Sequence, residues 1–167
     1  MIKAVVFDLD GTLIHLPIDY DTLFQRFGKI MQTSNVRPLT KTIPALDAET
    51  KKKVFKVWEQ IEIDALGNVT VNNEGLAVYE QHSRTTKALV TMQGKAFVRK
   101  LLETLSLSFA LVVTREDSLD RAEQLRIALK KLKVSPSEIL FTGNTDEDSH
   151  AAKKVGCKFQ RVAHKTG

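Results

Sequence analysis

Short apolar runs alternate with amphipathic segments through the second half of the sequence. The apolar runs are KALVTM, FALVVT, EILFTG and KFQRVA, beginning at residues 87, 109, 138 and 158. Between them lie GKAFVRKLLETL, SLDRAEQLRIALKKLKV and TDEDSHAAKKVG, which have helical spacing of apolar positions. The compact runs predict buried strands, and the segments between them predict helices. Strands that alternate with helices predict right-handed crossovers and a parallel sheet covered on both faces.

The first half of the sequence has a different texture after its opening. The run IKAVVF at residues 2–7 predicts one more buried strand. Residues 18–85 then show helical periodicity, which predicts helices at about 19–33, 47–65 and 71–82. We therefore expect an α/β fold, with a Rossmann-like parallel sheet core and a small all-helical insertion after the first strand.

Composition bounds the class of protein. The chain has 167 residues, of which 43% are hydrophobic and 27% charged, as in an ordinary globular domain with a modest insertion. The single cysteine, Cys157, cannot form an internal disulfide. No apolar run approaches the roughly 20 residues that span a bilayer, and MIKAVVFDLD does not resemble a signal peptide. We expect a cytoplasmic protein without membrane association.

The net charge of +5 is unevenly distributed along the chain. Residues 1–86 hold 10 basic and 11 acidic side chains, whereas residues 87–167 hold 15 and 9. A positive field of this kind attracts phosphorylated metabolites or nucleic acid, and its sign does not distinguish them. The basic half lacks interleaved aromatic residues and any nucleic-acid-binding motif, so we expect a small phosphorylated partner and no nucleic acid.

Polar side chains gather where predicted strands end, which is where open α/β sheets bind ligands. They are Asp8, Asp10, Gly11 and Thr12 after the first strand, Thr114 after FALVV, and Gly143, Asn144, Asp146 and Asp148 after EILFT. Any one of these aspartates alone would be interpreted as a solvated loop residue. Together they suggest hard oxygen ligands for Mg²⁺ and a carboxylate nucleophile toward phosphorus. Gly11 and Thr12 belong to a tight turn suited to an anion, and Thr114 offers a hydroxyl to a phosphoryl oxygen.

These motifs resemble those of haloacid dehalogenase superfamily phosphatases. The resemblance rests on an apolar strand followed by DLDGT, a strand ending in Thr, and a strand followed by GNTDEDSHAAKKVG. It covers residues 1–14 and about 90–162. Residues 15–86 occupy the place where members similar to phosphoglycolate phosphatases insert a helical cap. The resemblance implies a core of residues 1–14 and 87–167, trimmed because Thr114 leads directly into the next helix, and a cap of residues 15–86.

The resemblance also implies roles for single residues. Asp8 matches the nucleophile and Mg²⁺ ligand, and Asp10 matches the general acid/base, whose backbone carbonyl binds the metal. Thr114 matches the hydroxyl that steadies the transferring phosphoryl group. Asp148 matches the acidic residue that supports the metal shell. Asn144 stands where the family usually has its first acidic metal ligand, so we expect weaker Mg²⁺ binding, with Asp146 close enough in sequence to compensate.

Besides Asn144, the sequence departs from the family's usual pattern at a basic residue. The family usually has a lysine at the start of the helix before the last motif, and no lysine begins that helix here. Arg121, Arg115 and Lys95 stand at the starts of predicted helices and are the candidates to offset charge or to bind phosphate, with Arg121 nearest the usual place. An arginine there binds phosphate through two parallel hydrogen bonds.

Two functions follow from these residues. The first is a Mg²⁺-dependent phosphatase that hydrolyses a small phosphorylated metabolite through an aspartyl phosphate. The alternative is a catalytically weak or inactive member that binds a phosphorylated ligand or a protein partner, which Asn144 and the missing lysine favour. The sequence identifies neither the substrate nor the oligomeric state.

Overall fold

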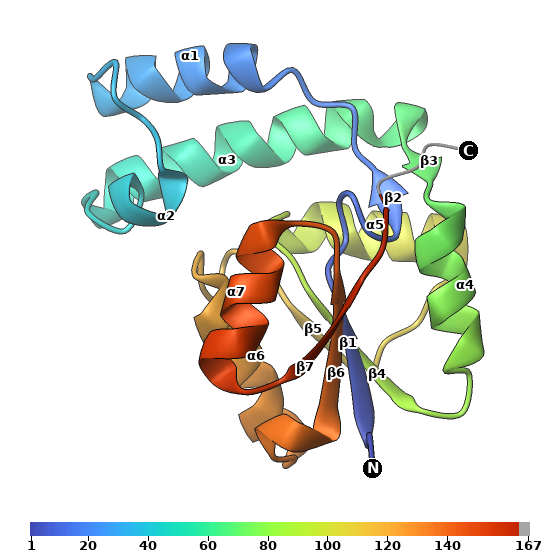
Figure 1. Ribbon diagram of the computed structural model, residues 1–167. Helices are drawn as coiled ribbons and strands as arrows, with labels where there is room; N and C mark the ends of the chain where they lie inside the picture. Colours follow the sequence, from blue (N-terminus) through green and yellow to red (C-terminus); the bar gives the residue numbers. More distant parts are fainter. Residues whose placement is uncertain (164–167) are drawn as a thin grey trace.

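A five-stranded parallel sheet forms the centre of the computed structural model, which describes residues 1–163 (Figure 1). Its strands lie in the order β5-β4-β1-β6-β7. Their bounds are Ala4–Phe7 for β1, Thr86–Val90 for β4, Leu111–Val113 for β5, Ile139–Gly143 for β6 and Lys158–Arg161 for β7. The structure thus confirms the predicted α/β fold with a parallel sheet. β1 lies in the middle, paired with β4 on one side and β6 on the other.

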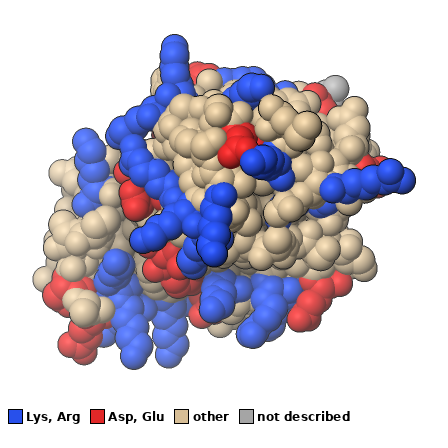
Figure 2. Space-filling model, turned by 90° about the horizontal axis from the view of Figure 1, so that it is seen from below, with Lys and Arg blue, Asp and Glu red and all other residues tan. Residues whose placement is uncertain are grey.

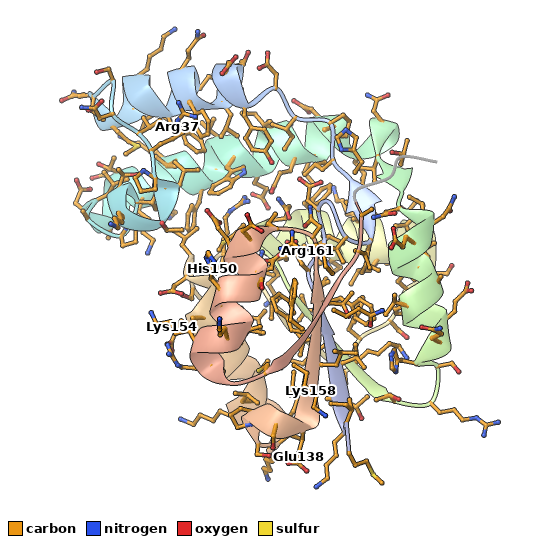
Figure 3. All side chains as sticks on the ribbon, in the orientation of Figure 1. Arg37, Glu138, His150, Lys154, Lys158 and Arg161 are labelled. Atoms are coloured by element: carbon orange, nitrogen blue, oxygen red, sulfur yellow. The ribbon has the colours of Figure 1, made fainter. Side chains whose placement is uncertain are left out.

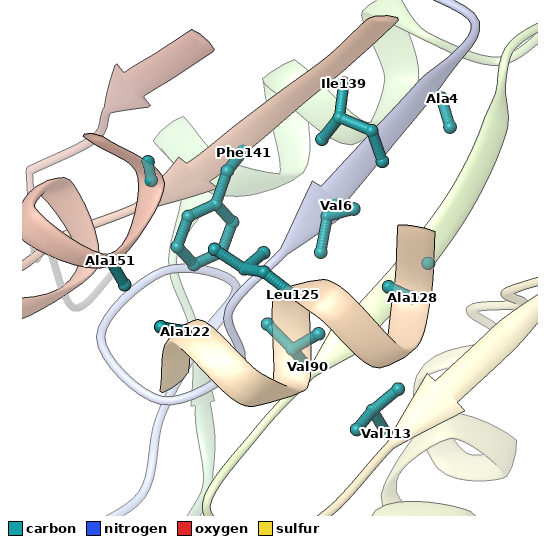
Figure 4. Close-up of a cluster of buried hydrophobic side chains, with 12 residues drawn as sticks. Ala4, Val6, Val90, Val113, Ala122, Leu125, Ala128, Ile139, Phe141 and Ala151 are labelled. Atoms are coloured by element: carbon teal, nitrogen blue, oxygen red, sulfur yellow. The ribbon is translucent and has the colours of Figure 1, made fainter. Parts of the chain in front are cut away.

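Helices cover both faces of the sheet because apolar residues of each strand alternate between them. Ala4 and Val6 of β1 face α6 (Arg121–Leu132) and α7 (Asp146–Val155), where their cluster includes Leu125 and Phe141 (Figure 4). Val5 and Phe7 pack on the other face against α4 (Asn73–Gln81) and α5 (Lys95–Leu105). This double coverage buries the whole of β1 and fixes the position of the residues that follow it.

The remaining helices form a layer above the carboxyl ends of the strands (Figure 1). They are α1 (Tyr20–Met31), the short α2 (Leu39–Thr42) and α3 (Ala48–Ala65). Leu23 and Phe27 of α1 and Val54 and Trp58 of α3 form a core of their own, in which Leu119 from the sheet side takes part. The two connections to the sheet pass through the short antiparallel pair β2 (Ile14–His15) and β3 (Thr70–Val71). The 3-10 turns Leu66–Asn68 and Pro136–Glu138 complete the elements.

The structure places α4 against the sheet and not in the layer above it. Val78 is buried in the same cluster as Phe7, and the rings of Tyr79 and Phe7 have centroids 6.0 Å apart. Residues 73–81 lie within the range expected for the cap, so in this structure the helical layer over the strand ends comprises residues 20–65. The division of the chain into two domains stays a prediction.

Basic side chains spread over the face of the molecule opposite the helical layer (Figure 2). Asp and Glu side chains lie among them. Lys130 and Lys131 occupy the last turn of α6, whose carboxyl end points to this face (Figure 1). Part of the excess positive charge in the second half of the sequence therefore lies far from the carboxyl ends of the strands. Within residues 1–163, none of the helices combines the length and the apolar character that crossing a bilayer requires.

A buried ion pair joins the helical layer to the sheet. Nη1 of Arg115 lies 2.7 Å from Oε2 of Glu62, and both side chains are fully buried. The guanidinium carbon of Arg115 lies 4.2 Å from the ring centroid of Trp58, and Oε1 of Glu62 accepts a hydrogen bond from the backbone of Gly94. Burial raises the pKa of Glu62 and the Arg115 charge opposes that shift. Each charge is thus tolerated in the interior because the other is present.

Replacement of Glu62 by alanine should destabilise the fold by about 3–5 kcal/mol, because it leaves the Arg115 charge buried without its partner. Urea unfolding followed by circular dichroism measures the change. Glu123→Ala is the matched control, since the Glu123–Arg126 pair is 3.6 Å long and exposed, and such pairs contribute at most about 1 kcal/mol. Equal effects of the two substitutions would contradict the role assigned to the buried pair.

Candidate active site

The segment after β1 forms a tight turn at the carboxyl edge of the sheet. The carbonyl of Leu9 accepts hydrogen bonds from the backbone N–H groups of Thr12, Leu13 and Ile14. Gly11 has φ +83°, in the left-handed region that glycine adopts without strain. The N–H of Asp8 donates to the carbonyl of Thr142 in β6 at 3.0 Å, so a hydrogen bond to the neighbouring strand holds Asp8 directly after β1. Asp8 is 5% exposed and lies just beyond the carboxyl end of β1.

Arg121 joins two buried carboxylates at this edge. Its Nη2 lies 2.9 Å from Oδ1 of Asp8 and its Nε lies 3.1 Å from Oδ1 of Asp148. Asp120 caps the helix that begins at Arg121, accepting the N–H groups of Ala122 and Glu123. The guanidinium is therefore held at the start of α6 with its two edges on two different acids. Of the three basic candidates from the sequence, the structure brings Arg121 to Asp8.

The environment of Asp8 disfavours its charged form. Burial raises the pKa of Asp8 to about 7, since desolvation outweighs the Arg121 charge and the Asp148 charge adds to the shift. A backbone hydrogen bond from Leu9 acts in the opposite direction, and the charge of Asp10 in the same direction as burial. Positive charge delivered to this position would stabilise the carboxylate, and a bound cation is one source of it.

Thr12 and Asn144 face the second oxygen of Asp8. The Thr12 hydroxyl lies 3.5 Å from Oδ2 of Asp8 and donates to Oδ1 of Asn144 at 3.2 Å. A Cβ on Gly11 would lie 2.2 Å from Nδ2 of Asn144, so only glycine allows Asn144 to reach the turn. The oxygens of Asp8 and Asn144 and the carbonyl of Asp10 are hard donors of the kind that Mg²⁺ prefers. Among residues 1–163 no group of three or more acidic, His or Cys side chains could hold a metal. The donor set fits Mg²⁺, with one carboxylate fewer than an aspartate at position 144 would give.

The two acidic residues of α7 have different surroundings. Oδ2 of Asp148 accepts the backbone N–H groups of Asn144 and Thr145, at 3.1 and 3.3 Å. In return, the N–H of Asp148 donates to the hydroxyl of Thr145, which caps α7. The Asp146 side chain is instead 85% exposed and pairs at 2.7 Å with Arg161, which is labelled in Figure 3. The structure therefore does not bring Asp146 to Asn144 as a substitute carboxylate, because it is engaged at the surface.

Asp10 lies between the sheet and the helical layer. Its Oδ1 accepts the backbone N–H of Leu16 at 2.9 Å. Its Oδ2 lies 3.5 Å from the hydroxyl of Tyr20, the first residue of α1. Asp10 thus stands two residues after Asp8, with contacts to the segment that leads into the helical layer.

The structure shows which threonine follows the strand beside β1. β4 pairs directly with β1, with Leu89 opposite Phe7, and Thr91 follows its last residue. Thr114 follows β5, which pairs with β4 and lies one strand further out. Thr91, and not Thr114, therefore lies at the carboxyl end of the strand beside β1.

Hydrogen bonds connect Thr91 to Arg121. The Thr91 hydroxyl is buried and donates to Oε1 of Gln93 at 2.6 Å, and the Thr91 carbonyl accepts from Nε2 of Gln124 at 2.9 Å. Oε1 of Gln124 in turn accepts from Nη1 of Arg121 at 2.8 Å. The hydroxyl of Thr114 instead donates to Glu116 at 2.7 Å. Sequence reasoning missed Thr91. Its signal is the same as that of Thr114, because KALVT and FALVVT are both apolar runs that end in Val-Thr.

Two basic candidates lie elsewhere. Arg115 is fully buried against Glu62 and the ring of Trp58, and its contacts do not include Asp8. Lys95 is exposed at the start of α5 and lines an open, apolar cavity of about 550 Å³ with Val98 and Leu102. Their predicted part in substrate binding is therefore not supported by contacts with the residues after β1.

The fold and this edge of the sheet match a known family. A model of haloacid dehalogenase-like hydrolases matches residues 18–162. The chain belongs to the haloacid dehalogenase-like hydrolases. This confirms the resemblance that the DLDGT turn and the GNTDEDSHAAKKVG segment indicated.

Relatives and solved structures agree with the assignment. A phosphoglycolate phosphatase from Salmonella paratyphi A is 34% identical over 201 residues, covering 93% of this chain and 79% of that protein. One from Salmonella typhimurium is 25% identical with the same coverage. Among solved structures, a haloacid dehalogenase-like family hydrolase from Streptococcus pneumoniae has a TM-score of 0.70 at 17% identity, covering 99% of this chain and 87% of that chain. The L-2-haloacid dehalogenase from Xanthobacter autotrophicus has a TM-score of 0.64 at 20% identity, covering 99% and 79%. Both structures share the fold.

Proposed function

We propose that this hydrolase is a Mg²⁺-dependent phosphatase that cleaves a small phosphate monoester through an aspartyl phosphate on Asp8. The observation that carries the proposal is the position of Asp8: it is buried at the end of the central strand, it is paired with Arg121 at 2.9 Å, and Asp10 follows two residues later. The phosphoglycolate phosphatases among its relatives support phosphatase activity.

Two carboxyl groups divide the reaction between them. A carboxylate oxygen of Asp8 attacks phosphorus, the bond from phosphorus to the leaving oxygen breaks, and Asp10 donates its proton to that oxygen. Asp10, now a carboxylate, then accepts a proton from a water molecule, whose oxygen attacks phosphorus and releases inorganic phosphate. Asp8 is regenerated as a carboxylate and Asp10 as an acid, so the cycle closes.

Cationic and donor groups around Asp8 would stabilise the phosphoryl charge. Arg121 is positioned to offset the negative charge that accumulates on the Asp8 side, and Thr91 offers a hydroxyl at the end of the adjacent strand. We assign to Thr91 the role that sequence reasoning gave to Thr114. Asp8, the carbonyl of Asp10 and Asn144 would hold Mg²⁺, with Asp148 holding Arg121 and the start of α7 in place. When bound, the ion supplies positive charge to the phosphoryl oxygens.

The helical layer over the strand ends favours a small substrate. It is attached to the sheet by the buried Arg115–Glu62 pair and brings Tyr20 to Asp10. We therefore propose a phosphorylated metabolite as the substrate, not a nucleic acid, and we retain the cytoplasm as the expected compartment.

A second candidate function rests on Asn144. An asparagine in the metal shell lowers its negative charge, and a member with weakened metal binding could bind a phosphorylated ligand or protein partner without turnover. The buried Asp8, with Asp10 beside it, argues against this alternative, because a binding protein gains nothing from a buried carboxyl group that is costly to ionise.

Hydrolysis of p-nitrophenyl phosphate and of phosphoglycolate tests the proposal. The wild type should release phosphate with Mg²⁺ and lose this activity with chelator, and Asp8→Asn should be inactive because the amide is no nucleophile. Circular dichroism controls for folding of the variant. Full activity of Asp8→Asn would contradict the aspartyl phosphate, and inactivity of the wild type on a panel of phosphorylated metabolites would favour the binding alternative.

Substitution of Thr91 and of Thr114 should have different effects on kcat in the same assay. Thr91→Val should lower kcat by about 100-fold, because a donor to the transferring phosphoryl group is lost from a nearly dry site. Thr114→Val is the matched control, and its kcat should stay close to that of the wild type, since its hydroxyl serves Glu116. The reverse order of effects would return the role to Thr114.

A further inference from the structure

Tyr20 brings a phenol from the helical layer to Asp10. Its hydroxyl lies 3.5 Å from Oδ2 of Asp10, at the long end for a hydrogen bond. Hydrogen bonds of catalytic groups are often long in ligand-free enzymes and shorten when substrate binds. The other oxygen of Asp10 accepts the N–H of Leu16 at 2.9 Å. The two contacts therefore hold opposite oxygens of one carboxyl group and define its plane.

The segment from Asp10 to Tyr20 is ordered by its own hydrogen bonds. Leu16 donates to Asp10, and the N–H of Ile18 donates to the carbonyl of Leu16 at 2.9 Å. Asp19 caps α1 by accepting the N–H groups of Asp21 and Thr22, and its other oxygen accepts the Thr22 hydroxyl. The direction of the Tyr20 side chain is thus set by the start of α1.

The position of α1 depends on α3 and on the sheet. Phe27 of α1 and Trp58 of α3 have ring centroids 5.5 Å apart, and Trp58 stacks on Arg115 of the sheet side. The Tyr20 ring lies 6.0 Å from the Phe24 ring, centroid to centroid. The hydroxyl therefore reaches Asp10 only while the helical layer keeps its contacts with the sheet.

The phenol is a donor in this setting. The ordinary pKa of a tyrosine hydroxyl is about 10. The hydroxyl keeps its proton at neutral pH, so it donates to Asp10.

We propose that Tyr20 is a positioning residue that orients the carboxyl group of Asp10 toward the leaving oxygen of the substrate. This inference rests on the proposed function, in which Asp10 is the general acid. It makes the helical layer part of acid catalysis, since the residue that aims the acid comes from α1 and the acid itself from the sheet.

Substrates whose leaving groups differ in basicity distinguish a positioning role of Tyr20 from a merely structural one. An alkyl phosphate such as glycerol 2-phosphate needs a proton on its leaving oxygen, whereas nitrophenolate leaves readily without one. Tyr20→Phe should lower kcat for glycerol 2-phosphate about tenfold more than kcat for p-nitrophenyl phosphate, as expected for one lost hydrogen bond of about 1.4 kcal/mol. The effect should appear in kcat more than in KM.

Tyr79→Phe is the matched control, because the other tyrosine of the chain bonds the backbone of Ser108 at 3.0 Å and packs on Phe7. It should affect both esters equally. An equal loss on both esters in Tyr20→Phe, or no loss on either, would overturn the positioning role. Asp10→Asn tests the underlying function separately: full hydrolysis of glycerol 2-phosphate by that variant would show that Asp10 is not the acid, whatever Tyr20 does.

Discussion

The contact on which the site depends is the pairing of Arg121 with Asp8 and Asp148. Parallel strands bring their carboxyl ends to one edge, so the acids after β1 and β6 meet where water is nearly excluded. Two carboxylates in such a place repel each other and are poorly solvated. The guanidinium touches one oxygen of each, at 2.9 and 3.1 Å, and makes their proximity tolerable. Asp120 caps the start of α6 and Thr145 caps the start of α7, and these caps hold the side chains of Arg121 and Asp148 in position.

The segment between β5 and α6 connects this site to the helical layer above it. Near its start Arg115 pairs with Glu62 of α3, and directly after it Arg121, the first residue of α6, pairs with Asp8. Leu119, between them, packs in the core of the helical layer. One short stretch of chain, residues 115–121, therefore carries the arginines of both ion pairs, so the position of the helical layer over the site and the charge within the site are set together.

Local patterns were sufficient to predict much of this arrangement. Apolar runs bounded by Asp8, Thr114 and Gly143 located strands, and Arg121 was the basic candidate nearest the place where the family usually has its lysine. Periodicity does not reveal which strands are neighbours, however. Thr91 and Thr114 both follow apolar runs, and only the sheet order shows that Thr91 ends the strand beside β1.

The other differences have similar causes. Arg115 was expected at the phosphate because it stands at the start of a predicted helix, but Glu62, 53 positions earlier, gives it a buried partner. Tyr20 falls within the helix expected over residues 19–33, and its hydroxyl meets Asp10 only through the fold of the intervening segment. Long-range pairs of this kind leave no signal in a local window of sequence.

A double-mutant cycle between Arg121→Met and Asp8→Asn tests the central pairing most directly, with the free energy of unfolding measured in urea. We predict that Arg121→Met is strongly destabilising in the wild type and much less so when Asp8 is already neutral, with a coupling of about 1–3 kcal/mol. Additive effects of the two substitutions would contradict the account, because they would mean that Arg121 does not offset the buried charge of Asp8.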